Sequence, residues 1–358
     1  MSSLTTNYLA PTGREEAWRF TPLNRLAGIL DAATALVPQN SFTSSSLPAG
    51  VTLEQSQIAP LSATTDEATL RVRAAQSEAL VLTIAANTEL SEPIILSRIP
   101  HMSKLAASRL IIKIGTHAHA RVILENQGNA VMAEEIEYDL SDGSTLNVVS
   151  LQEWESESVY LGRHHALVSK DATFISTIVS VGGSLVRILP TVEYRGAGAS
   201  AELNGLYFAT DGQHLEHRIH VDHNVGHAKS RVNYKGALAG DKARTVWIGD
   251  VYIRAAAEGT DTYELNRNLL LTDGARADSV PNLEIETGEI VGAGHASTTG
   301  RFDDEQLFYL ESRGIPADEA RRLVIRGFFA EIASKVGSEE IQERIMERID
   351  RDLAKVGA

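Results

Sequence analysis

Residues 145–194 read TLNVVSLQEWESESVYLGRHHALVSKDATFISTIVSVGGSLVRILPTVEY. Short runs within this stretch, such as TLNVVSL, TFISTIV and VRILPTVEY, alternate apolar and polar residues, which is the period of a β-strand. Small or polar residues separate the runs, and no apolar stripe of helical length lies between them. The stretch therefore predicts strand after strand.

The same pattern extends over residues 69–290, beginning with TLRVRA at 69–74, and it repeats. One strand of each repeat opens after a turn near Ala120, Thr145, Thr173, Ala201 and Ser230. These positions are separated by 25, 28, 28 and 29 residues. A second strand follows near Ser158, Ser184, His214 and Arg244. A repeat of two strands without a helix predicts a β-solenoid, in which each coil buries its apolar face against its neighbours. A large β-sandwich is the alternative, because residue identities hardly repeat.

Helical patterns occupy the two ends of the chain. Residues 14–36 place Trp18 and three leucines near helical spacing, and a Ser/Pro/Gly-rich segment at 38–50 follows as a flexible tether. After Arg301 the apolar period again becomes helical. We therefore expect an N-terminal helical region with a linker at 1–68, a β-solenoid core at 69–300 and a C-terminal helical domain at 301–358.

The C-terminal domain is expected to hold several helices. Pro316, with two acidic residues after it, favours the start of one helix, and Ser338 is a plausible N-cap for the next. The first of these helices carries an apolar stripe formed by Ala320, Leu323, Val324, Gly327, Phe328 and Ile332. Phe328 and Phe329 cannot both face one direction. We expect one core residue with a partly exposed neighbour, and the alternative is a docking contact for a partner.

Composition excludes several classes of function. The 358 residues carry 33 Lys and Arg against 47 Asp and Glu, and this net charge of −14 provides no general footprint for nucleic acid. The chain has no cysteine, so any sulfur chemistry must take its sulfur from a partner. The start MSSLTTNYLAPTGREEAW lacks the pattern of a leader, and no apolar run has the length of a membrane span. We expect a cytoplasmic protein that binds neither nucleic acid nor membrane.

Five of the eleven histidines lie in HLEHRIHVDHNVGH at 214–227. This concentration suggests a metal site. In a strand, however, His214 and His220 would face one side while His217 and His223 face the other. We therefore expect hydrogen-bonded or solvated strand histidines, although a ladder with histidines of adjacent coils is an open alternative.

No motif for autonomous catalysis is present: GxSxG, GxxxxGK[ST] and HExxH are all absent. We expect a non-enzymatic protein. One alternative is a β-solenoid carbohydrate-active enzyme such as a lyase, which would need paired acids or a basic catalyst beside aromatic sugar platforms. The aromatic content of 6% counts against it. A homomeric metal-binding protein built on the histidine run is the other alternative.

Residues 213–332 carry a series of motifs in a fixed order. They include NRNLLL at 266–271, PNLEI at 281–285, His295 with small residues after it, and LFYL at 307–310 followed by SRG. Over about a third of the chain this series resembles the SufB/SufD family of iron–sulfur cluster assembly proteins. The early EEAWRFTPL resembles the family's N-terminal tryptophan motif, which occurs mainly on the SufD side.

The resemblance implies a right-handed parallel β-helix flanked by helical regions. It also implies a scaffold that acts with a cysteine-bearing SufB-like paralogue and a SufC-like ABC ATPase. SufD typically supplies a histidine, which matches His295, to a nascent iron–sulfur cluster or iron shared with the partner. Many relatives have a cysteine where this chain has Ala293, which favours SufD over SufB. The family's aromatic-then-glycine pair appears with shifted spacing as Trp247-Ile248-Gly249.

The resemblance assigns ATPase contact to the C-terminal helices. From these helices we select a partner interface formed by Leu310, Arg313, Leu323, Phe328 and Phe329. A transient cluster or iron is expected at the partner interface, and no cofactor in the isolated chain. The cluster type, a role for flavin, direct ligation of iron by His295, and homodimer formation by the chain alone are left open.

Overall fold

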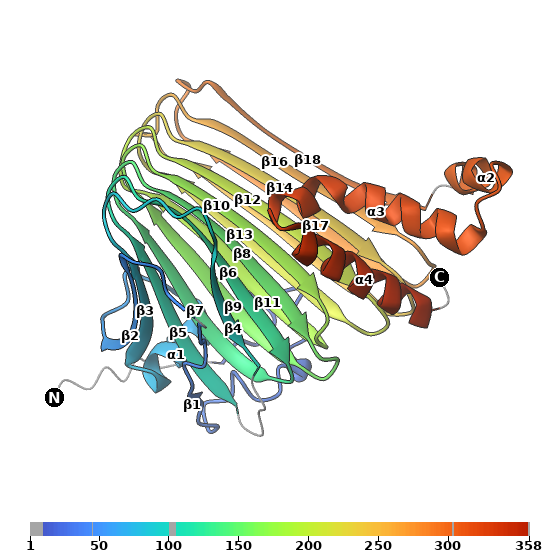
Figure 1. Cartoon of the computed structure of the whole chain (residues 1–358), viewed down its shortest axis with the longest axis horizontal. Coiled ribbons are helices and arrows are strands. Elements are labelled where there is room, and N and C mark those ends of the chain that lie inside the picture. Colours follow the sequence, from blue (N-terminus) through green and yellow to red (C-terminus); the bar gives the residue numbers. More distant parts are fainter. Residues whose placement is uncertain (1–9, 45, 100–104, 303, 357–358) are drawn as a thin grey trace.

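The computed structural model describes residues 10–44, 46–99, 105–302 and 304–356. Two large β-sheets lie face to face, and successive strands alternate between them (Figure 1). One sheet contains β2 and the odd-numbered strands, with β1 attached to β5, and its strands are β1 Val37–Pro38, β2 Val51–Gln57, β3 Glu78–Ile84, β5 Ala106–Ile114, β7 Val131–Leu140, β9 Val159–Val168, β11 Leu185–Tyr194, β13 His214–His223, β15 Arg244–Ile253 and β17 Arg276–Ile285. The other sheet contains β4 Ile94–Arg98, β6 His119–Gly128, β8 Thr145–Trp154, β10 Thr173–Val181, β12 Ser200–Ala209, β14 Lys229–Leu238, β16 Asp261–Leu270 and β18 Gly292–Arg301.

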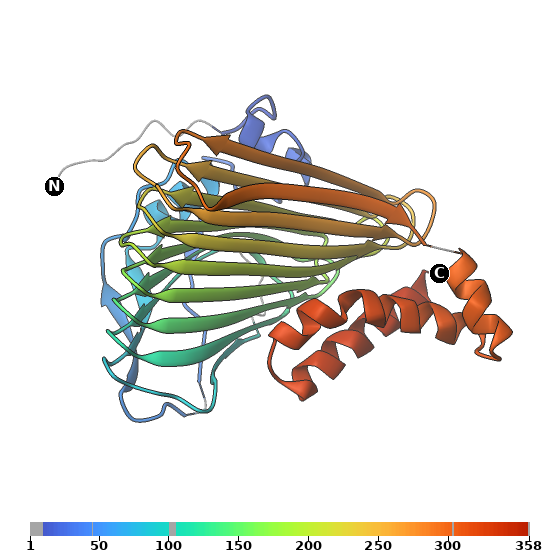
Figure 2. The same cartoon turned by 90° about the horizontal axis from the view of Figure 1, so that it is seen from above.

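Neighbouring strands within each sheet come from successive coils and run parallel, apart from the antiparallel pair β2–β3. The predicted β-solenoid is confirmed, and the sandwich alternative is wrong. The predicted starts at Thr145, Thr173, His214 and Arg244 are the first residues of β8, β10, β13 and β15. Figure 2 shows the stacked strands from above, with the C-terminal helices along one flank.

One turn of each coil contains a residue in the left-handed backbone region, two positions before the next even-numbered strand. These residues, with φ between 54° and 77°, are His117, Gly143, Asp171, Gly198, His227 and Gly259. Glycine, aspartate and histidine tolerate this conformation better than branched residues do. The N–H of His117 donates to the carbonyl of Asp142 in the next coil, and that of His227 donates to the carbonyl of Glu258. The turns therefore stack as regularly as the strands.

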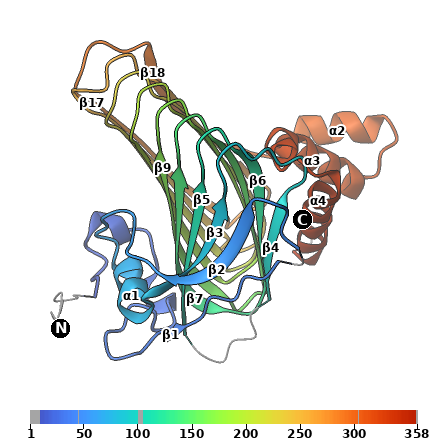
Figure 3. The same cartoon turned by 60° about the vertical axis from the view of Figure 1, so that its left-hand side comes forward.

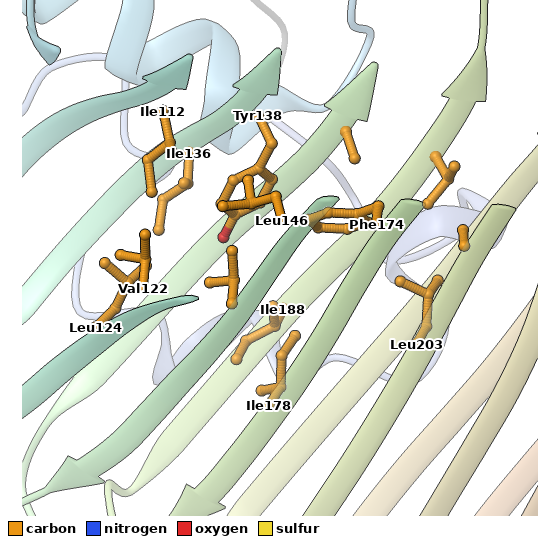
Figure 4. Packing of buried hydrophobic residues seen from close by; sticks show 14 of the residues in the cluster. Ile112, Val122, Leu124, Ile136, Tyr138, Leu146, Phe174, Ile178, Ile188 and Leu203 are labelled. Atoms are coloured by element: carbon orange, nitrogen blue, oxygen red, sulfur yellow. The ribbon is translucent and has the colours of Figure 1, made fainter. Parts of the chain in front are cut away.

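The space between the sheets is the main hydrophobic core. In the early coils it is filled by aliphatic and aromatic side chains such as Ile112, Val122, Ile136, Tyr138 and Phe174 (Figure 4). Alternation places every second residue of a strand in this space, which is why the strands have a period of two. The interior also holds polar side chains, among them the Arg98–Glu134 ion pair of the early coils and Glu264 of a later one.

The N-terminal segment covers the outer face of the ten-stranded sheet (Figure 3). The helix predicted over 14–36 was wrong, because the chain forms only 3₁₀ turns at Glu16–Trp18 and Leu23–Arg25. Pro22 and the left-handed Gly28 interrupt a longer helix. Trp18 is fully buried, beneath the guanidinium of Arg187 at 3.9 Å from its ring centre. The motif around Trp18 therefore fastens this segment to the solenoid.

Two further N-terminal expectations need correction. Residues 38–50 are no free tether, since Phe42 is buried and Thr43 forms an antiparallel bridge to Ser97. The run TLRVRA is not a strand but part of helix α1, Glu67–Ala75. The Asp66 carboxylate caps this helix by accepting from the backbone N–H of Thr69 at 2.9 Å. The division of the chain at 68 and 300 stays a prediction; α1 spans the first position, and β18 ends beside the second.

The C-terminal helices are α2 Asp304–Ser312, α3 Ala317–Lys335 and α4 Glu339–Lys355. Ser338 caps α4, as predicted, by accepting from the N–H of Ile341 at 3.4 Å. Helices α3 and α4 pack on the outer face of the eight-stranded sheet, against apolar residues of β6, β8, β10, β12 and β14. The predicted stripe on α3 is confirmed at Ala320 and Ile332, but its phase is wrong between them, because Ile325 and Phe329 are buried while Leu323 is 45% exposed. Among the described helices, none has the length and apolar character needed to cross a membrane.

Candidate functional site at the open end of the solenoid

The two ends of the solenoid differ. At the first end, antiparallel β2 covers the edge of β3, and Thr43 bridges to β4. At the other end, β17 pairs with β15 and β18 pairs with β16, and neither has a second partner among the described strands. Each outer edge thus presents a ten-residue row of backbone donors and acceptors that can pair with another chain.

His295 lies on β18 at this open end. It stands in register with Glu264 of β16 and then Val232 of β14, whose side chain belongs to the interior core. Its side chain therefore lies on the inward face, yet it is exposed because no described strand follows. On the outer face, Gly294 lies beneath the ring of Tyr263, and a Cβ on Gly294 would come within 3.2 Å of that ring. Because its neighbours on β18, Gly294 and Ala296, are small, the imidazole of His295 is accessible.

Glu264 is the unusual neighbour of His295. Its side chain is 1% exposed, and neither carboxylate oxygen has a hydrogen-bond partner in the described part of the chain. Burial, with a further contribution from the charge of Asp250, raises the pKa of Glu264 to about 8. Between the ordinary pKa and about 8, the folded chain holds this proton more tightly than the unfolded chain does. Rising pH therefore lowers stability across this interval.

Gly249 on the opposite sheet makes room for this carboxylate. A Cβ added there would lie 2.7 Å from Oε1 of Glu264 and 2.6 Å from the indole ring of Trp247, which is fully buried. The Trp247-Ile248-Gly249 sequence therefore has a clear packing role: the missing side chain accommodates both the indole and the carboxylate. Sequence reasoning did not select Glu264, whose environment depends on contacts between separate strands.

The residues next along the same face of β16 are fully hydrogen-bonded. Asn266 donates to the hydroxyl of Tyr207 at 2.9 Å, and Asn268 donates to the side-chain oxygen of Asn266 at 2.8 Å. Tyr207 in turn donates to Asn268 at 2.7 Å, and Ser279 donates to Asn266 at 2.8 Å. The NRNLLL motif thus supplies a closed polar network, and the unpartnered Glu264 stands beside it.

A sequence model described as "SUF system FeS cluster assembly, SufBD core domain" matches residues 97–328. The chain belongs to the SufBD family. An iron–sulfur cluster assembly SufBD family protein of Mycobacterium tuberculosis (strain ATCC 25618 / H37Rv) is 47% identical over 354 residues, covering 96% of this chain and 89% of that protein. SufD of Escherichia coli (strain K12) is 32% identical over 196 residues, 55% of this chain and 46% of that protein. SufD of Bacillus subtilis (strain 168) is 36% identical over 130 residues, 36% of this chain and 30% of that protein.

The histidine run of this SufBD family chain divides between the two faces of β13, as the alternation predicted. On the inner face, His217 shares a 3.0 Å hydrogen bond with Ser180 and stacks on Tyr207, and His223 shares one of 2.9 Å with Ser230. Burial lowers the pKa of His217 to about 3 and that of His223 to about 4. Both are therefore neutral residues of the interior.

The other histidines of the run have separate surroundings. His214 lies 3.0 Å from a carboxylate oxygen of Glu216, beneath the N-terminal segment. His220 packs against the ring of Tyr252, and His227 occupies a left-handed turn. Across the described residues, no three His, Asp or Glu side chains are placed to hold one metal ion. The run thus forms no convergent ligand set in this SufBD family chain.

The five residues selected as a partner interface have different exposures. Arg313 and Leu323 are exposed, Leu310 and Phe328 are half-buried, and Phe329 is fully buried within the chain. The structure therefore brings only some of them to the surface. Sequence reasoning missed the most exposed aromatic residues of this region, which are Phe308 at 72% and Tyr309 at 56%. Their adjacency in LFYL was the available signal.

Proposed function

We propose that this chain is a SufD-type, non-catalytic scaffold subunit of a cytoplasmic SUF system, acting with a SufB-like paralogue and a SufC-like ATPase. The observation that carries the proposal is an accessible, inward-facing His295 on the last strand of an open-ended solenoid. Imidazole is a suitable ligand for iron and replaces thiolate at one iron of some clusters. Because the chain has no cysteine, the thiolates and sulfide must come from another protein.

The open edges of β17 and β18 are the reason to place the contact with the paralogue at this end of the solenoid. A second solenoid can continue both sheets by pairing with these two edges, and it would cover His295 as it does so. A cysteine on the paralogue would then lie beside the imidazole. In this arrangement the cluster forms between subunits, and this chain alone holds no stable cluster.

Replacing His295 by Ala is expected to lower iron and cluster retention in the complex at least tenfold, because one ligand is removed from a site with few others. The side chain is exposed, so subunit assembly should be little affected. The measurement is the visible absorbance and iron content of anaerobically reconstituted complex, compared at equal yield.

His119→Ala is the matched control, since His119 is an exposed histidine on β6, away from the open end. It should leave cluster content unchanged. Wild-type cluster content in the His295→Ala complex would contradict the proposed site.

Helix α2 with the start of α3 is the proposed ATPase contact. Phe308 and Tyr309 on α2 and Leu323 on α3 expose apolar surface, and the guanidinium of Arg313 lies 5.1 Å from the ring centre of Tyr309. Exposed aromatic and arginine residues are typical of interface hot spots. Phe329, which is buried against the sheet, is not proposed to touch the partner.

The double variant Phe308→Ala/Leu323→Ala is expected to weaken ATPase binding at least 30-fold, because truncating one hot-spot residue alone costs about 2 kcal/mol of binding free energy. Both side chains are exposed, so the melting temperature should stay within about 2 °C of wild type. Binding is measured by titration of purified ATPase, with Val37→Ala, an exposed apolar position on β1 of the other sheet, as the control. Full-affinity binding by the double variant would refute this contact. Deletion of 301–358 is a poorer test, because it would uncover the apolar outer face of β8–β14.

A further inference from the structure

Glu134, a buried carboxylate elsewhere in the solenoid interior, has partners. Glu134 of β7 receives two 2.6 Å hydrogen bonds from Arg98 and a third, at 2.7 Å, from the hydroxyl of Tyr160. Glu264 faces the same interior, and among the described residues its carboxylate has neither a hydrogen-bond partner nor an ion pair; the neighbouring charge that affects it is Asp250. A buried acid of this kind is costly, and such exceptions concentrate at functional sites.

We propose that Glu264 and His295 together form one half of a ferrous iron site, completed by ligands of the paralogue across the open edge. This inference rests on the proposed function, because the second half of the site requires a partner at β17 and β18. It adds a carboxylate ligand to the imidazole and assigns iron, rather than sulfide, as the cargo bound by this chain.

The register places the two side chains next to each other on one face. Glu264 and His295 are directly opposite each other on adjacent parallel strands, which are about 4.8 Å apart, and both side chains lie on the inward face. The absence of a side chain at Gly249 provides space for the carboxylate. Two side chains cannot complete the coordination of iron, and in the described residues no third ligand joins them.

The chemistry of the pair favours Fe(II). A carboxylate oxygen and a neutral imidazole nitrogen are the donor types of non-haem ferrous sites, whereas a copper(I) or structural zinc site would use several thiolates. The cation also supplies the positive charge that Glu264 lacks. Binding therefore gives the buried carboxyl group a cationic partner and fixes the ion where thiolates of the paralogue can join it.

The test uses the complex of the full chain with its cysteine-bearing paralogue, titrated anaerobically with Fe(II) in the absence of sulfide. Bound iron is measured after gel filtration, and its ligands are examined by X-ray absorption at the iron edge. The variants are Glu264→Gln, His295→Ala and the control Glu157→Gln, which changes an exposed glutamate in the turn between β8 and β9, away from the open end. Gln is nearly isosteric with Glu and places no charge in the interior, so thermal stability should be retained.

Glu264→Gln and His295→Ala are each expected to weaken Fe(II) binding at least tenfold and to remove one oxygen or nitrogen ligand from the spectrum. The control should bind as wild type does. If His295→Ala weakens binding but Glu264→Gln does not, the carboxylate is no ligand and this inference falls, while the proposed function stands. If neither variant changes iron binding, both this inference and the role of His295 in the proposed function are contradicted.

Discussion

Replacing Glu134 by Ala is expected to lower the free energy of unfolding by about 3–5 kcal/mol, because it leaves Arg98 charged and unpaired in the interior. Both side chains are inaccessible to solvent, and they share two hydrogen bonds of 2.6 Å. Arg98 also lies 4.2 Å from the ring centre of Phe42, so the pair ties the N-terminal segment to the first coils. Chemical denaturation of the isolated chain measures the loss.

The double variant Arg98→Met/Glu134→Leu is the control for this prediction. It removes both charges and fills the space with apolar atoms, so it should recover most of the stability lost by Glu134→Ala. Equal losses in the single and the double variant would show that packing around the pair, rather than the stranded charge, controls stability.

Phe329→Ala is expected to cost about 3–5 kcal/mol, since it empties a fully buried position between α3 and the eight-stranded sheet. The helical layer should detach first, because it meets the solenoid through this one apolar surface. Limited proteolysis between Arg301 and Ala317 and loss of helical circular dichroism at lower temperature measure the effect.

Phe328→Ala supplies the matched comparison. Phe328 is half-buried, and its ring lies 5.5 Å from the ammonium of Lys235. Its truncation should cost about 1 kcal/mol or less, in line with a partly exposed residue. A larger loss for Phe328→Ala than for Phe329→Ala would contradict the packing of α3 described above.

The solenoid was predictable because its signals are local. The alternation of apolar and polar residues predicts each strand, and the turn residues predict where the next one begins. The spacing of Thr145 and Thr173, which are paired in the sheet, is the length of one coil. Residue identities did not repeat at the turns because glycine, aspartate and histidine all satisfy the same left-handed conformation. His227 is one of these turn residues, and this conformation accounts for a histidine at its position.

The sequence-based predictions were wrong where a local pattern is compatible with two structures. TLRVRA alternates like a strand, but the carboxylate of Asp66 before it caps a helix, and this signal was available in the sequence. The period of α3 was correct, yet its phase depends on the sheet beneath it and could not be read from the helix alone. In α4, apolar residues recur every fourth position and are all buried, so the sequence alone indicates both period and phase; they are Ile341, Ile345, Ile349 and Leu353.

For Glu264, the sequence shows the residue type but not its environment. Its isolation depends on β16 being the penultimate strand of one sheet and on Gly249 of the other sheet. Neither relation follows from the sequence TYELNRNL. His295 was selected only through family resemblance, and its position at an unpaired edge came from the strand order.

The difference between the ends of the solenoid limits how many copies can join in a row. A rod with two bare ends could add subunits indefinitely and grow into a fibre. Here β2 runs against the direction of the strand it covers, so the first end offers no parallel continuation of the coil. Among the described strands, parallel continuation is therefore offered at one end, and joining two such solenoids through these ends would produce a closed pair with a single buried seam.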